Sequence, residues 1–81
     1  MHEVGLMQQA VEIALDHGRA EAAQRITRVG LKVGTLSGAE PDALRFAFDI
    51  VTRGTIAEGA ELQIDSAEAV YDLQVSWIEV D

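Results

Sequence analysis

The amino terminus of the chain offers a nitrogen-rich set of potential metal ligands. Met1 brings an α-amino group, which titrates near ~8, and His2 and Glu3 place an imidazole and a carboxylate beside it. If the amine, the His2 ring and one or two deprotonated backbone amides converge, they form a flat nitrogen set. That set suits Ni(II) or Cu(II) better than Zn(II), Mg(II) or Ca(II). Taken alone, a histidine at position 2 is more often an ordinary side chain than a metal ligand, so the rest of the chain must decide.

Few other groups in the chain could carry chemistry. Cysteine is absent, and the three serines lack the surrounding patterns of an activated nucleophile. The glycines at 34 and 38 match no phosphate-binding motif. The other histidine, His17, is expected at a helix end, where it acts more often as a cap than as a ligand. The sequence therefore does not predict an enzyme.

Length and composition narrow the class of protein. The 81 residues, 48% hydrophobic and 25% charged, predict one small globular domain. A formal net charge of −8 disfavours nucleic acid and anionic membranes as partners. Without cysteines, a leader or an apolar run of about 18 residues, the expected compartment is the cytoplasm and no zinc site is expected.

Apolar residues at helical spacing predict two helices. The first covers residues 4–17, with Gly18 as its carboxyl-terminal cap. The second begins at Pro41 and ends before Gly54. The predicted buried positions are Met7, Val11, Ala14 and Leu15 in the first helix, flanked by Leu6, Ala10 and Ile13, and Leu44, Ala47, Phe48 and Val51 in the second, with Phe46 expected to join the core.

Three strands are predicted at residues 25–33, 60–70 and 73–80. In the first, Thr27, Val29, Leu31 and Val33 are expected on the buried face. The alternation slips near Ser66 and again at Ser76-Trp77, and these slips could lie opposite each other in one antiparallel ladder. Tyr71-Asp72, between the last two strands, lacks the glycine or asparagine of a tight hairpin turn, which suggests strain, a longer continuous strand or strand exchange between chains.

The order α-β-α-β-β predicts an α+β two-layer fold. A strand–helix–strand unit places its two strands parallel with a right-handed crossover. The last strand would run antiparallel to the second. We therefore expect a small three-stranded mixed sheet with both helices on one face.

Several segments of the chain closely resemble the HypA/HybF family of nickel metallochaperones that mature [NiFe]-hydrogenase. They are MHEVGLM at residues 1–7, RVGLKVGTLSG at 28–38, FAFD at 46–49, VTRGT at 51–55 and EGA at 58–60. They occur in the family's order over nearly the whole chain.

The resemblance implies a function and a site. It implies that the chain delivers Ni(II) to a hydrogenase large subunit and that a partner GTPase shares the task of nickel insertion. Some members of the family also serve urease. The family's nickel site falls on Met1 through its amine, His2 through its imidazole and amide, and Glu3 through its amide, with the Glu3 carboxylate as a further candidate donor. Because His2 is bulky, we expect the initiator methionine to be retained.

The chain departs from the family in one respect. Family members carry a zinc-binding domain with two Cys-x-x-Cys pairs before the final strand, and here the chain runs from Val70 through Tyr71-Asp72 to Leu73 without a cysteine. The sequence thus predicts one HypA-like nickel domain over residues 1–81, without the zinc domain expected at about residues 70–73. The short link also favours a strand-swapped homodimer. The alternative is a metal-free interaction module that docks the same GTPase or large subunit.

Overall fold

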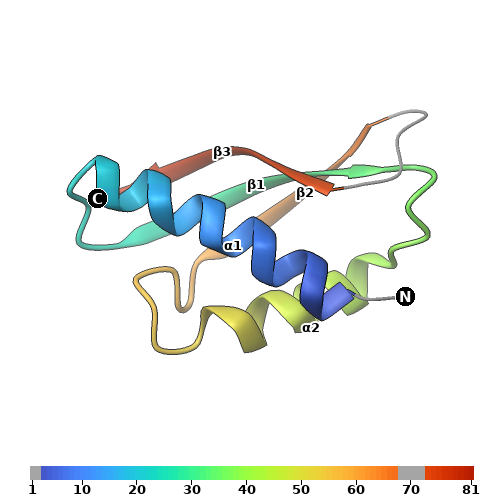
Figure 1. Ribbon diagram of the computed structural model, residues 1–81, viewed down its shortest axis with the longest axis horizontal. Coiled ribbons are helices and arrows are strands. Elements are labelled where there is room, and N and C mark those ends of the chain that lie inside the picture. Colours follow the sequence, from blue (N-terminus) through green and yellow to red (C-terminus); the bar gives the residue numbers. More distant parts are fainter. Residues whose placement is uncertain (1–2, 68–72) are drawn as a thin grey trace.

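The computed structural model describes residues 3–67 and 73–81 and has two layers, a sheet and a pair of helices (Figure 1). The predicted order of elements is confirmed. The elements are α1 (Glu3–Ala20), β1 (Ile26–Gly34), α2 (Pro41–Thr52), β2 (Glu61–Ala67) and β3 (Leu73–Val80). No helix in the described part of the chain is long and apolar enough to cross a membrane.

The sheet is mixed, as predicted, with strand order β2-β1-β3. The central strand β1 pairs in parallel with β2, where Val29 lies opposite Leu62, and antiparallel with β3, where Val29 lies opposite Ile78. Because β1 separates β2 from β3, the two predicted slips cannot face each other in one ladder, and that prediction is wrong. A tight hairpin turn is not required between strands that are not neighbours, which accounts for the missing turn residues. Tyr71-Asp72 themselves lie outside the described residues.

Two irregularities in the β1–β3 ladder set which side chains face the core. At Ser76, β3 carries one residue more than β1, so the slip predicted there is confirmed. Because of this extra residue, Val75 and Ile78 face the same side of the sheet although they are three positions apart. Leu73, Val75 and Ile78 therefore all pack against the core. The slip predicted near Ser66 is wrong for the described part of β2, whose register with β1 is regular to Ala67.

The second irregularity lies at the start of β1 and corrects its predicted faces. Between Ile26 and Arg28, β1 advances two residues while β3 advances one, from Val80 to Glu79. Ile26 is therefore fully buried and Thr27 is exposed, the reverse of the simple alternation. The predicted burial of Val29, Leu31 and Val33 is confirmed.

The predicted buried positions Met7, Val11, Ala14 and Leu15 of the first helix are confirmed. The helix ends at Ala20, three residues later than predicted. Gly18 lies inside α1, where a Cβ would come within 3.0 Å of Ile26 Cδ1, so its role is close packing and not capping. The helix ends in a Schellman motif in which Ala22 adopts φ 54°. The amide of Ala23 donates to the Gly18 carbonyl and that of Ala22 to the Arg19 carbonyl, at 3.0 Å each.

The second helix begins as predicted, with Pro41 in its first turn and the Glu40 carboxylate accepting a hydrogen bond from the Asp42 amide. Leu44, Ala47 and Phe48 are buried, and Val51 is partly buried against the same core. Phe46 is 67% exposed, so its predicted place in the core is wrong. It lies two positions from both Leu44 and Phe48, on the opposite side of α2.

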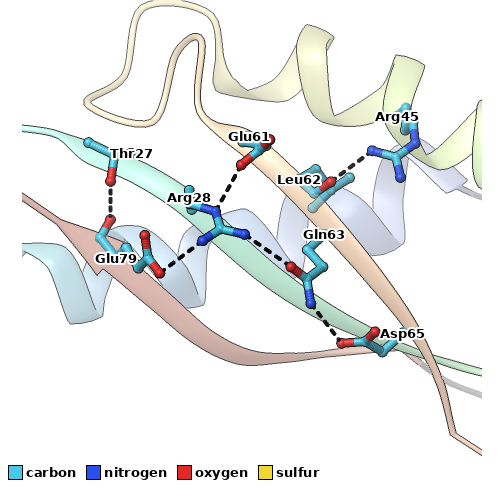
Figure 2. A network of polar contacts seen from close by, with 8 residues as sticks. All are labelled: Thr27, Arg28, Arg45, Glu61, Leu62, Gln63, Asp65 and Glu79. Carbon is cyan, nitrogen blue, oxygen red and sulfur yellow. Dashed lines mark hydrogen bonds and ion pairs between the residues drawn. The ribbon is translucent and has the colours of Figure 1, made fainter.

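On the helix-free face of the sheet, Arg28 connects all three strands (Figure 2). From β1, its Nη1 donates to Glu79 on β3 and its Nη2 to Gln63 on β2, at 3.1 Å each. Its Nε lies 2.8 Å from Glu61 Oε1 in an ion pair whose angle falls outside that of a hydrogen bond. The guanidinium carbon lies 5.4 Å from the Trp77 ring centroid, within cation–π range.

Replacing Arg28 by methionine is expected to lower the free energy of unfolding by about 1 kcal/mol, because partly exposed ion pairs contribute modestly. Urea denaturation measures the change, and high salt should reduce the difference from the unaltered protein. The matched control is Arg53→Met, since the exposed Arg53 side chain makes no ion pair with the described residues. Equal losses in the two variants would contradict a role for Arg28 in joining the strands.

Candidate metal centre at the start of the first helix

Of the predicted site residues, the structure describes only the backbone of Glu3. Met1 and His2 lie outside the described residues, and Glu3 is the first residue of α1. Burial of Met7 at 1% and Val11 at 4% holds α1 against the sheet. The helix thus fixes the point from which the predicted ligands extend.

The first turn of α1 offers backbone amides that have no partner within the helix. The first four N–H groups of an α-helix have no intrahelical carbonyl partner, and that of Glu3 is one of them. An amide that donates no hydrogen bond can lose its proton to a metal without breaking the helix. The start of α1 is compatible with the amide ligation expected from the sequence.

The first turn of α1 is also open to solvent. Val4 is 47% exposed, and a Cβ built on Gly5 would meet no other atom within 4 Å. An ion at this end of the helix could therefore be approached by a donor or an acceptor protein.

The remaining histidine cannot join the same ion. His17 lies 14 residues along α1 from Glu3, and at a rise of 1.5 Å per residue the separation is about 21 Å. Its side chain is exposed in the last turns of α1. Within the described ranges, no group of three or more His, Cys, Asp or Glu residues could hold a metal ion.

The tertiary structure brings further carboxylates to the same end of the molecule, which the sequence did not predict. Figure 1 shows α1 and α2 beginning at this end, and the two helices pack against each other. Glu40 and Asp42 lie at the start of α2. No local signal links them to Met1, because the packing of two helices is a long-range effect.

Two electrostatic effects act on a cation at this position. The positive end of the α1 dipole disfavours it by roughly 0.3–1 kcal/mol at an exposed site. The formal net charge of −8 attracts cations over a longer range. Deprotonated amide ligands would add negative charge directly at the ion. This charge would offset the unfavourable effect of the positive end of the α1 dipole.

Comparison with known proteins identifies the family. A family model described as hydrogenase/urease nickel incorporation, metallochaperone, hypA matches residues 1–73. The chain belongs to the HypA family. A hydrogenase maturation factor HypA from Methylocella silvestris is 51% identical over 65 residues, which cover 80% of this chain and 58% of the relative. A HypA from Salmonella typhimurium is 46% identical over 69 residues, covering 85% of this chain and 58% of the relative. The chain thus spans about three-fifths of the length of these HypA proteins.

A solved HypA structure has the same fold. The solution structure of the Ni metallochaperone HypA from Helicobacter pylori superposes with a TM-score of 0.84, covering 99% of this chain and 97% of that one at 14% identity. The helix–sheet arrangement predicted from the sequence is therefore that of a HypA protein.

Proposed function

We propose that this chain is a nickel metallochaperone, which binds Ni(II) through Met1, His2 and Glu3 and delivers it for [NiFe]-hydrogenase maturation. The observation that carries the proposal is the family match, which names nickel incorporation and begins at residue 1, so that it includes the amino-terminal motif. The position of the Glu3 amide in the first turn of α1, where amides have no intrahelical carbonyl partner, supports it further.

The proposed chemistry is ligand exchange on the cargo ion, without an enzymatic reaction. The Met1 amine, the His2 ring and the amides of His2 and Glu3 bind nickel in a flat arrangement, and the Glu3 carboxylate is a further oxygen donor. The amine and the amides must lose a proton and the imidazole must be in its neutral form before they bind, so nickel competes with protons for these ligands. An exposed helix start allows the ion to pass to an acceptor.

The proposal extends to partners and compartment. A maturation GTPase and a [NiFe]-hydrogenase large subunit are the proposed partners in the cytoplasm, with urease maturation as a second route because the family description includes it. No nucleic acid or membrane is proposed as a partner. We propose one nickel domain over residues 1–81 without a zinc domain, since the chain has no cysteine to supply thiolates.

A second candidate function is a metal-free module that docks the same partners. The observation behind it is that the aligned residues cover 58% of the Methylocella and of the Salmonella relative, so the chain matches only part of those proteins.

Titration with Ni(II) distinguishes the two functions. We expect about one ion per chain, and His2→Ala should weaken binding roughly a hundredfold, which corresponds to about 2.8 kcal/mol. The control is His17→Ala, the same substitution about 21 Å away along α1, which should leave the affinity unchanged. Calorimetry or equilibrium dialysis measures both. Absence of nickel binding by the unaltered chain would favour the docking module.

A further inference from the structure

A groove runs between α1 and β3, and we call it the α1–β3 groove. It consists of two hollows of about 380 and 390 Å³. Val75 lines both hollows, so they adjoin along the strand. The first extends to Glu21, just after the end of α1, and to Val80 on β3, and the second extends to Leu6 and Leu73.

The wall of the groove formed by α1 is a single helical stripe. Leu6, Ala10, Ile13, His17 and Ala20 line it at alternating spacings of four and three residues. This stripe lies beside the one that packs on the sheet. Ile13 is 50% exposed, and Val80 across the groove is 37% exposed.

The floor of the groove is the outer edge of the sheet. Among the described strands β3 is terminal, so the backbone groups on one of its sides have no partner in a described strand. The other terminal strand, β2, is protected by α2, because Arg45 Nη1 donates to the Leu62 carbonyl at 2.7 Å (Figure 2). Among the hydrogen bonds of the described residues, the one side-chain donor to the β3 backbone is Thr27, from the β1 side.

The charge of the groove selects the chemistry of an occupant. None of the described residues that line it is lysine or arginine, and Glu21 is an acid on its rim. A second copy of the chain would bring its own net charge of −8 to this surface. A segment that carries basic residues is complementary instead.

We infer that the α1–β3 groove binds an extended segment of a partner protein, in which apolar and basic residues alternate, by adding it as a strand to β3. The bulge at Ser76 divides β3, and the added strand pairs with the longer stretch, residues 77–80. Because alternate residues of a strand face opposite sides of the sheet, its apolar side chains enter the two hollows and its basic side chains lie on the helix-free side, where Glu79 extends from β3. A basic residue at the end of the segment, beyond the paired stretch, meets Glu21. The inference goes beyond nickel delivery and does not depend on it.

Trp77 makes the inference testable without metal. It lies in the stretch of β3 that the added strand pairs with, and it is the only tryptophan in the chain. Its indole packs over Gly30 on the helix-free face of the sheet, so its fluorescence reports on the addition of a strand to β3. The probe is an eight-residue peptide of alternating valine and lysine, titrated into the full chain. We expect saturable binding with a change in Trp77 emission, and slowed amide exchange in residues 77–80.

Three comparisons test the separate parts of the inference. The peptide N-methylated at alternate residues should not bind, because it cannot form one set of edge hydrogen bonds. Glutamate in place of lysine should also abolish binding. Glu21→Lys should weaken the valine–lysine peptide about fivefold or more, whereas Glu12→Lys, an equal charge change on α1 outside the groove, should have less effect.

Other results would overturn the inference. Equal binding of the N-methylated peptide would exclude strand addition, and equal effects of Glu21→Lys and Glu12→Lys would reduce the interaction to net charge. Absence of peptide binding would also contradict it. If sedimentation shows a dimer that Ile13→Lys dissociates while the matched Phe46→Lys does not, the occupant is a second copy of the chain.

Discussion

Acetylation of the Met1 amine is expected to lower the affinity for Ni(II) by roughly two orders of magnitude, or about 2.8 kcal/mol. An acetylated nitrogen has no lone pair available for the metal, and the amine is the ligand that no internal residue can replace. The flat set would lose one of its corners, because no described His, Cys, Asp or Glu cluster offers a substitute.

The chemical modification can be restricted to the terminus. At about pH 6.5, α-amino groups, which titrate near 8, react in preference to lysine side chains, which titrate near 10.4. The chain has one lysine, Lys32, and a Lys32→Arg background removes it from the comparison. Intact mass checks that Met1 is retained and that one acetyl group is added. Unchanged affinity after acetylation would show that the site is assigned to the wrong residues.

Nickel affinity is also expected to fall as the pH falls. Protons and nickel compete for the amine, the imidazole and the amides, so each displaced proton lowers the apparent affinity about tenfold per pH unit in the range where that group is protonated. Titrations at pH 8, 7 and 6 should show this decrease. A pH-independent affinity would argue against nitrogen ligands at the terminus.

Gly30→Ala is expected to displace the Trp77 indole and lower the free energy of unfolding by about 1–3 kcal/mol. A Cβ at Gly30 would lie 2.6 Å from Trp77 Cδ2 and still closer to Cε2 and Nε1. The indole therefore has to leave the surface of β1, and the cation–π contact with Arg28 is lost with it. Tryptophan fluorescence should shift to longer wavelength, and urea denaturation should show the loss of stability.

Gly5→Ala is the matched control for this substitution. Gly5 lies in α1, and a Cβ there would meet no atom within 4 Å. Alanine is the better helix former, so this variant is expected to gain about 0.5–1 kcal/mol. If Gly30→Ala were as stable as the unaltered protein with unchanged fluorescence, the packing of Trp77 on Gly30 would be refuted.

The sequence by itself was sufficient to predict the elements and the layer architecture. Met7, Val11, Ala14 and Leu15 define a helix face through their spacing, and burial of that face was confirmed. The candidate ligands Met1, His2 and Glu3 were also predicted from the sequence, because they are adjacent in it and carry the family motif.

The tertiary structure alone decided which strands are neighbours and how they match. Because β1 lies between β2 and β3, the two predicted slips cannot lie opposite each other in one ladder. The irregularity before Arg28 places Ile26 on the buried face and Thr27 on the exposed face, the reverse of the prediction. The tertiary structure also brings the start of α2, with Glu40 and Asp42, to the end of the molecule where α1 begins (Figure 1). The unprotected edge of β3 and the groove beside it arise in the same way. Periodicity along the chain reports only on the face that each residue occupies, whereas strand order, register and helix packing depend on contacts between residues far apart in sequence.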